Sequence, residues 1–102
     1  MPKTILNEVF EAVRKMGLTR TESEFSVDWL GRSECYMSTL RFENQSPSIA
    51  TIAICASKLQ HYGERMVRTQ QYRAAGRQFL QLSDQCHAEI NRDAEATWLE
   101  AV

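Results

Sequence analysis

The 102-residue sequence lacks the patterns that mark membrane, secreted and metal-dependent proteins. It has no run of about 18 apolar residues, which a membrane-spanning helix needs, and its first residues lack the apolar core of a signal peptide. His61 and His87 are the only histidines, and no HExxH or CxxC pattern accompanies them. A glycine-rich phosphate loop is also missing. We therefore expect a cytoplasmic protein without metal, cofactor, small-molecule substrate or membrane contact.

Cysteines are few and widely spaced, at Cys35, Cys55 and Cys86. Their odd number does not favour a disulfide framework, and each lies in a helical apolar pattern, so we interpret them as small core residues in a reducing compartment. Cys86 and His87 are neighbours, but adjacent residues of a helix point about 100° apart. Adjacency alone does not make them a nucleophile and base, and we predict that the chain is not an enzyme.

An excess of positive charge is missing too, because the formal net charge is −1. Lysine and arginine contacts to phosphate normally supply much of the affinity of a DNA-binding domain, so this balance weighs against a simple basic one. The charges are unevenly distributed: five of the six charged residues from Lys58 to Arg77 are basic, and five of the six from Asp84 to Val102 are acidic. A face near the middle of the chain can therefore still carry positive potential.

The stretch from Thr21 to Leu59 carries clear helix-boundary signals. Thr21 and Glu24 form a capping box, in which the threonine hydroxyl and the glutamate carboxylate each accept from a free backbone N–H. A helix should therefore begin at Glu22. Gly31 can adopt the left-handed conformation that ends a helix, so this helix should stop at Leu30. Its expected buried face consists of Phe25, Val27, Trp29 and Leu30.

Two further helices are expected in the same stretch. Ser33 is a good N-cap for a helix that runs to Asn44, with apolar residues at spacings of three and four: Tyr36, Met37 and Leu40. Ser46 followed by Pro47 predicts the start of another helix, because proline suits the first helical position. This helix should run to about Gln60 and bury one face: Ile49, Ile52, Ala53, Ala56 and Leu59.

A helix, a glycine turn and a second helix that starts with serine make up a helix-turn-helix, whose second helix lies in the major groove of DNA. The segment from Glu22 to Leu59 resembles the lambda-repressor-like helix-turn-helix family. Gly31 and Ser33 match the first and third places of that family's turn. The positions that are buried in that family are apolar in this sequence, at Leu30, Met37 and Leu40. In the family, a helix that starts with proline follows the second helix, and Pro47 matches that proline.

The resemblance implies a sequence-specific DNA-binding transcriptional regulator, of bacterial or phage type, with double-stranded DNA as its partner. Its expected contact residues lie on the exposed side of the second helix and in the flanking turns: Arg32, Ser33, Glu34, Cys35, Ser38, Thr39, Arg41 and Gln45. Hydroxyl groups can contact phosphates or base edges, and arginine can contact guanine or phosphate. Glu34 is either a specificity element, accepting from a cytosine amino group, or a sign against DNA binding, because phosphates repel a carboxylate.

Helices are also expected on both sides of this stretch. Residues 2–17 carry an apolar stripe that ends at Gly17. Beyond a bend or break near His61-Tyr62-Gly63, apolar residues at steps of three and four predict a helix from about Glu64 to Ile90. After Cys86 the steps are all four, so the stripe rotates around the helix. This rotation favours a stop near Asn91 and a short terminal helix that carries Trp98 and Leu99.

The expected fold is all-α, with a small helix-turn-helix domain of about four helices in residues 1–62 and a long helical extension in residues 63–102. The apolar stripe of the extension predicts a homodimer through residues 64–100, which would set two recognition helices at a fixed spacing. The alternative is that the extension folds back and completes the core of a monomer.

A second function class stays open at this stage. Capped amphipathic helices joined by short turns carry no chemistry by themselves. The chain can equally be a helical protein–protein interaction module or adaptor without DNA binding, in which aromatic residues form an exposed apolar surface: Trp29, Tyr36, Phe42 and Trp98. Binding to DNA should weaken steeply with salt, whereas an apolar protein interface should be nearly indifferent to it.

Overall fold

A computed structural model describes residues 4–100, and all of the secondary structure in that range is helical. The α-helices are α1 (Ile5–Lys15), α2 (Glu22–Asp28), α3 (Tyr36–Glu43), α4 (Ile49–Met66) and α5 (Arg73–Glu100), and a short 3-10 helix, η1 (Gln70–Tyr72), precedes α5. The expected all-α fold with a long C-terminal helix is confirmed. Pro2, expected near the start of the first helix, lies outside the described residues.

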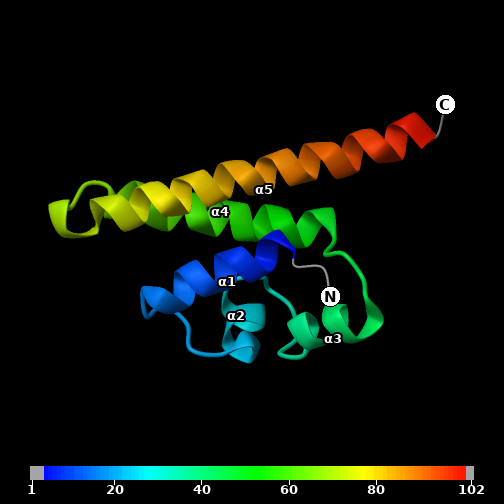
Figure 1. The fold of residues 1–102 in the computed structure, drawn as a ribbon, viewed down its shortest axis with the longest axis horizontal. Helices are drawn as coiled ribbons and strands as arrows, with labels where there is room; N and C mark the ends of the chain where they lie inside the picture. Colours follow the sequence, from blue (N-terminus) through cyan, green and yellow to red (C-terminus); the bar gives the residue numbers. More distant parts are fainter. Residues whose placement is uncertain (1–3, 101–102) are drawn as a thin grey trace.

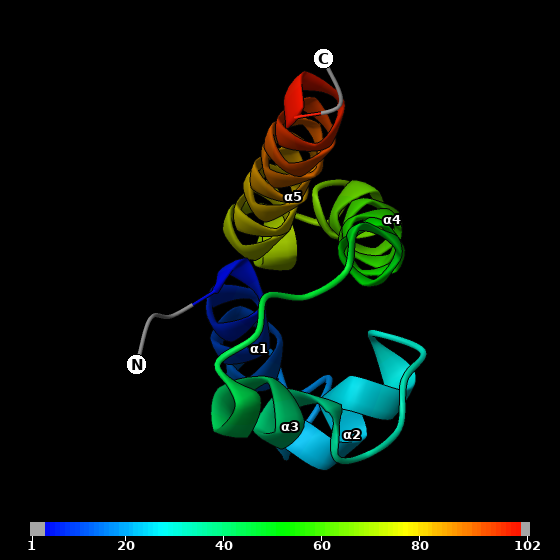
Figure 2. The ribbon, with the colours of Figure 1, turned by 90° about the vertical axis from the view of Figure 1, so that its right-hand side faces the viewer.

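The helices are arranged in layers (Figure 1). The long helices α4 and α5 run antiparallel along one side of the molecule, α1 lies beneath them, and the short α2 and α3 lie on the far side from α5. The view along the long axis shows the same order (Figure 2). The C-terminal part of α5 continues past the start of α4 and projects from the body of the molecule. Within residues 4–100, no helix is long and apolar enough to cross a membrane.

One hydrophobic core joins all five α-helices, with Trp29 near its centre. The Trp29 side chain is only 2% exposed. Its ring stacks on Tyr62 of α4, with centroids 5.2 Å apart, and meets Phe79 of α5 edge-on at 6.2 Å. The residues expected to be buried on the two short helices lie in this core, except that Val27 is half-exposed and Tyr36 is only partly buried against it. Ile49 and Ala53, expected to be buried on α4, are exposed as well.

Helices α4 and α5 approach each other closely at two glycines. A Cβ atom on Gly63 would lie 2.9 Å from the Leu80 side chain, and one on Gly76 would lie 2.8 Å from the backbone nitrogen of Val67. Real Cβ atoms do not approach other atoms so closely, so a side chain at either position would force a neighbour to move: the Leu80 side chain at Gly63, and backbone at Gly76. The break expected near His61-Tyr62-Gly63 was therefore wrong: α4 passes through these residues to Met66, and the chain reverses between Val67 and Tyr72.

The expected stop near Asn91 and the separate terminal helix were also wrong, because α5 runs unbroken from Arg73 to Glu100. No proline or glycine follows Gly76 to interrupt it. The first half of α5 folds back on the core, where Phe79, Leu82 and Cys86 are buried. The Ser83 hydroxyl donates a hydrogen bond of 2.9 Å to the buried Ala56 carbonyl of α4. The boundary expected between residues 62 and 63 thus lies inside α4, and the extension contributes to the same core as the short helices.

The glycine that ends α1 acts as expected. Gly17 has φ +74°, its N–H donates to the Arg14 carbonyl at 2.9 Å, and the N–H of Leu18 donates to the Val13 carbonyl at 3.2 Å. This pair of bonds is the Schellman arrangement, in which a left-handed residue turns the chain and satisfies the last carbonyls of a helix. The reversal places α1 against the helices that follow.

The helix starts agree with expectation only in part. The Thr21 hydroxyl accepts from the N–H of Glu24 at 3.2 Å, but the Glu24 carboxylate accepts from the N–H of Arg20 instead of Thr21. Helix α4 begins at Ile49, and its N-cap is Ser48, whose hydroxyl accepts from the N–H of Thr51 at 3.2 Å. Ser46 is therefore not the cap, and the first helical position is not Pro47.

Candidate nucleic-acid interface

The connection between α2 and α3 is longer than the expected three-residue turn. Helix α2 ends at Asp28, two residues before Leu30, and α3 begins at Tyr36, three residues after Ser33. Gly31 reverses the chain with φ +64°, as expected, and the N–H of Arg32 donates to the Ser26 carbonyl at 2.9 Å. The segment from Trp29 to Cys35 therefore forms an irregular loop between the two helices.

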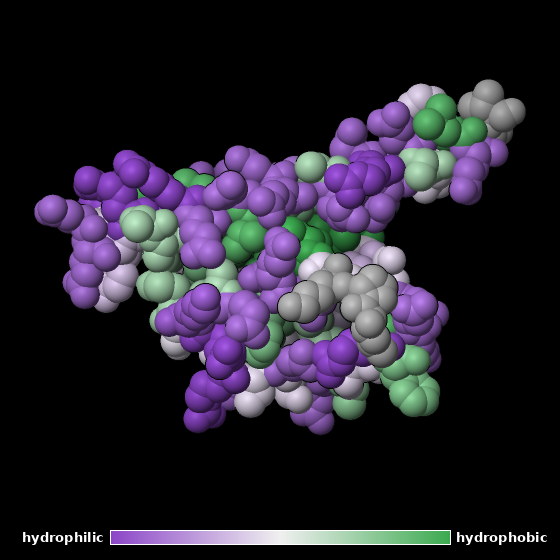
Figure 3. Space-filling view, viewed as in Figure 1, coloured by the Kyte–Doolittle hydropathy of each residue, from purple (hydrophilic) through white to green (hydrophobic). Residues whose placement is uncertain are grey.

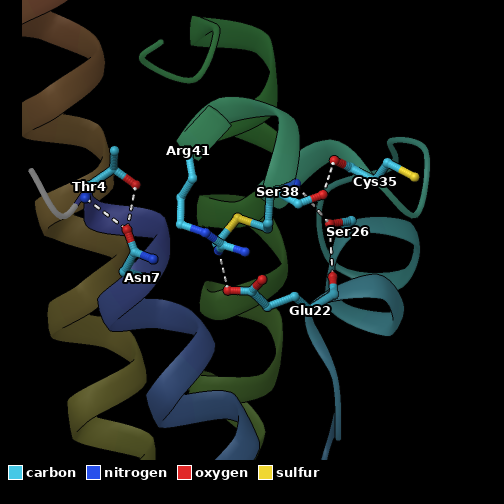
Figure 4. A network of polar contacts seen from close by, with 8 residues as sticks. Thr4, Asn7, Glu22, Ser26, Cys35, Ser38 and Arg41 are labelled. Carbon is cyan, nitrogen blue, oxygen red and sulfur yellow. Dashed lines mark hydrogen bonds and ion pairs between the residues drawn. The ribbon is translucent and has the colours of Figure 1, made fainter. Parts of the chain in front are cut away.

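One face of α3 is held against α2. Met37 and Leu40 are buried in the core. The buried Ser26 hydroxyl donates to the Glu22 carbonyl at 2.8 Å and accepts from the N–H of Met37 at 3.4 Å, which links the two helices through one polar side chain (Figure 4). Because the contacts lie on one face of α3, its other face is left to solvent.

All of the residues expected to contact DNA are exposed. Those before α3 lie in the loop, those in the middle lie on the helix, and the last follows its end: Arg32, Ser33, Glu34, Cys35, then Ser38, Thr39, Arg41, and Gln45. The Ser38 hydroxyl donates to the Cys35 carbonyl at 2.9 Å within the first turn (Figure 4). Their exposure leaves them accessible to a partner.

Arg41 forms an ion pair within the protein. One guanidinium nitrogen lies 2.6 Å from a carboxylate oxygen of Glu22, at the start of α2 (Figure 4). Both side chains are partly exposed, so water screens the pair. Exposed ion pairs contribute about 0–1 kcal/mol. Arg41 can therefore exchange Glu22 for another anion at a small cost.

Arg32 ties the loop to the start of α4. Its Nε donates to the Thr51 hydroxyl at 2.9 Å, another guanidinium nitrogen donates to the Ser48 hydroxyl at 3.1 Å, and the guanidinium lies over the Tyr36 ring. These partners are uncharged, so they do not neutralise the positive charge of Arg32. This positioning role was not predicted from the sequence. Ser48 and Thr51, three residues apart at a helix start, were the available signal.

The surroundings of α3 are acidic. Between Arg20 and Gln45 there are three arginines and five acidic residues: Glu22, Glu24, Asp28, Glu34 and Glu43. Arg20 pairs with Glu24 at 2.9 Å, and hydrogen bonds from the Arg20 side chain and N–H lower the pKa of Glu24. The basic residues of the α4–α5 turn lie at the opposite end of the molecule from α3 (Figure 1): Arg65, Arg68, Arg73 and Arg77. They cannot supply positive potential at α3.

The cysteines form no ligand site. Cys55 and Cys86 are buried, as expected, and a hydrogen bond between their thiols, together with burial, raises the pKa of Cys55. Cys55 therefore remains a neutral core thiol. The core interpretation was wrong for Cys35, which is exposed beside α3. Across residues 4–100, no group of three His, Cys, Asp or Glu side chains is placed to hold a metal ion.

One protein family matches the chain, from residue 6 to residue 99. The chain belongs to DUF6626. That family is described as one of unknown function, so membership assigns no activity. The DUF6626 match includes α2, α3 and the loop between them, and it extends along α5 to Leu99. No curated protein and no solved structure matches the chain.

Proposed function

We propose that this DUF6626 chain is a sequence-specific DNA-binding transcriptional regulator that places α3 in the major groove. The observation that carries the proposal is the anchoring of α3 by Met37 and Leu40, while all of the expected contact residues remain exposed. A recognition helix needs this division, because one face must be held by the protein while the other meets base edges. Ser38, Thr39 and Arg41 would then face the groove.

The charges around α3 limit how such an interface can gain affinity. Arg32 has uncharged partners and remains available to phosphate, and Arg41 can leave the exposed Glu22 at a cost of about 0–1 kcal/mol. Neutralising about two phosphates gives a salt slope of roughly −2 for each protein chain, well below that of a strongly basic DNA-binding domain. We therefore expect weak non-specific binding, with sequence preference coming from base contacts.

Selection from random DNA duplexes tests the proposal. Purified protein is incubated with the pool at salt concentrations of about 50 and about 200 mM, a range over which phosphate-dependent binding weakens, and retained duplexes are sequenced. An enriched motif is expected, and Arg41→Ala and Ser38→Ala should lose it. Arg14→Ala is the matched control, because Arg14 also pairs with a glutamate, Glu11, but on α1. Absence of enrichment and of duplex retention at the lower salt would refute the proposal.

A protein–protein interaction module is the second candidate, and the exposure of Phe42 favours it. This side chain lies on α3 and is 91% exposed, an unusual position for a large aromatic residue in water. The aromatic surface expected from the sequence is not assembled, because Trp29 is buried in the core. Phe42→Ser would weaken a protein contact at α3. If the parent protein enriches no duplex motif, the interaction module becomes the better interpretation, and Phe42→Ser should then weaken binding to a protein partner.

A further inference from the structure

The end of α5 extends beyond the helix that it packs against. Ser83 of α5 contacts Ala56 of α4, and the two helices run antiparallel, so Ile49 at the start of α4 lies opposite about residue 90 of α5. At 1.5 Å per residue, the remaining ten positions project by about 15 Å. Near the tip, Trp98 is 57% exposed and Leu99 is 54% exposed. Figure 3 shows apolar residues at this projecting end.

A single stripe of residues runs along this end of α5, and we name it the α5 stripe. Its members recur at helical spacing and are all exposed: Ala88, Asn91, Arg92, Glu95, Ala96 and Leu99. Residues three and four positions apart lie on the same side of a helix. The stripe therefore combines small residues, one apolar residue and two opposite charges on one accessible surface.

The α5 stripe is complementary to itself when a second α5 runs antiparallel. With a two-fold axis between Asp93 and Ala94, Leu99 lies opposite the partner's Ala88, so a large side chain meets a small one. In the same register, Arg92, which also pairs with Glu89 of its own helix at 2.5 Å, lies opposite the partner's Glu95, and the symmetry forms this intermolecular pair twice. A parallel pairing would place each charge opposite its own copy. Charge and size thus select the antiparallel arrangement.

We propose that the α5 stripe is a homodimer interface for a second copy of this chain, with the two helices antiparallel about an axis between Asp93 and Ala94. The inference goes beyond DNA binding and does not depend on it. It narrows the dimer surface from residues 64–100 to the projecting end, because the first half of α5 is already covered by its own core. A contact over about 17 Å of helix is smaller than a standard interface. The dimer should therefore be weak, and its fraction should rise with protein concentration.

Charge reversal tests both the dimer and its register. The full-length protein is examined by sedimentation velocity over a range of concentrations, without DNA. Arg92→Glu and Glu95→Arg each place like charges opposite one another twice, so each should raise the Kd by at least about tenfold. The double variant Arg92→Glu with Glu95→Arg restores opposite charges in this register alone, and its Kd should return close to that of the parent protein.

Arg14→Glu is the matched control for Arg92→Glu. It makes the same change of charge at an exposed arginine that also pairs with a glutamate three residues earlier, but on α1, and it should leave the Kd unchanged. Far-UV circular dichroism verifies that each variant keeps its helices. A parent protein that remains monomeric at every concentration up to roughly 1 mM would overturn the proposal. So would single variants without effect, or a double variant that fails to recover.

Trp98 gives an independent readout. It lies one turn beyond Glu95, at the edge of the α5 stripe, whereas Trp29 is buried in the core. Dimerisation should protect Trp98 from iodide, so the quenchable fraction of the tryptophan fluorescence should fall as the protein concentration rises. The same titration of Arg92→Glu should stay flat over that range. Equal quenching of the parent protein at every concentration would contradict the proposed interface.

Discussion

Replacement of Gly76 by alanine should destabilise the protein, although alanine is the better helix former. A Cβ at this position would lie 2.8 Å from the Val67 nitrogen and 2.9 Å from the Met66 Cβ. The first of these atoms belongs to the backbone and the second is bonded to it, so the steric clash is removed only if α4 and α5 move apart. Overpacking of this kind costs about 1–3 kcal/mol, and the helix propensity of alanine returns at most about 1 kcal/mol. Since backbone must move, we expect a net loss of about 2 kcal/mol.

Thermal unfolding followed by circular dichroism measures this loss. For a domain of this size, about 2 kcal/mol lowers the Tm by roughly 8–16 °C. Ala74→Gly, at an exposed position of the same helix, serves as the control for propensity alone. Gly63→Ala should cost less than Gly76→Ala, because the nearest atoms belong to the flexible Leu80 side chain. A Gly76→Ala variant at least as stable as the parent protein would refute the close-approach reasoning.

Three further predictions follow from polar contacts near α3. Arg32→Ala removes two hydrogen bonds to the start of α4 and should lower the free energy of unfolding in urea by about 1–2 kcal/mol. Glu22→Gln weakens the hold on Arg41 and should tighten binding to a selected duplex by about threefold, a change of the size of one exposed ion pair. The lowered pKa of Glu24 beside Arg20 stabilises the fold above the ordinary pKa of 4.5, and this contribution is lost as the pH falls through the lower folded value.

Each of these has its own control and contrary outcome. Glu8→Gln makes the same change of charge as Glu22→Gln, but at an exposed position of α1, and an equal gain in DNA affinity would show that only net charge matters. If Arg32→Ala leaves the free energy of unfolding in urea unchanged, water replaces the hydrogen bonds to the Ser48 and Thr51 hydroxyls without loss of stability, and the prediction is wrong. Glu24→Gln should flatten the acid limb of a stability–pH curve, and a curve identical to that of the parent protein would contradict the assignment.

Features that depend on neighbouring residues in the sequence were predictable. Gly17 and Gly31 both adopt positive φ, and Thr21 caps α2, because a cap or a left-handed residue is specified within a few positions. The spacing of apolar residues likewise identified Trp29 and Leu40 as core residues. Periodicity works here because each short helix has one side to bury.

Features that depend on distant residues were not predictable from the local pattern. Gly63 has the propensity of a helix breaker, yet its role is set by contact with Leu80 and with the Gly76 carbonyl. Ser46 and Ser48 flank the same proline, and Ser48 is the residue that Arg32 contacts. After Cys86 the apolar residues recur at steps of four, and this spacing was interpreted as a break in the helix. In the structure, α5 continues unbroken, but beyond Cys86 it no longer packs fully against the core and extends into solvent.

The position of Trp29 also governs how the protein folds. Trp29 stands between α2 and α3 in the sequence, and its aromatic partners Tyr62 and Phe79 come from the two long helices. With seven and eight residues, α2 and α3 are too short to persist alone in water. During synthesis, helices α2 and α3 should therefore become stable only after α5 has left the ribosome, because only then can Trp29 pack against Phe79. The chain should fold in one cooperative step, with tryptophan fluorescence and helical signal changing together in urea, and a product ending before α5 should be a substrate for proteases.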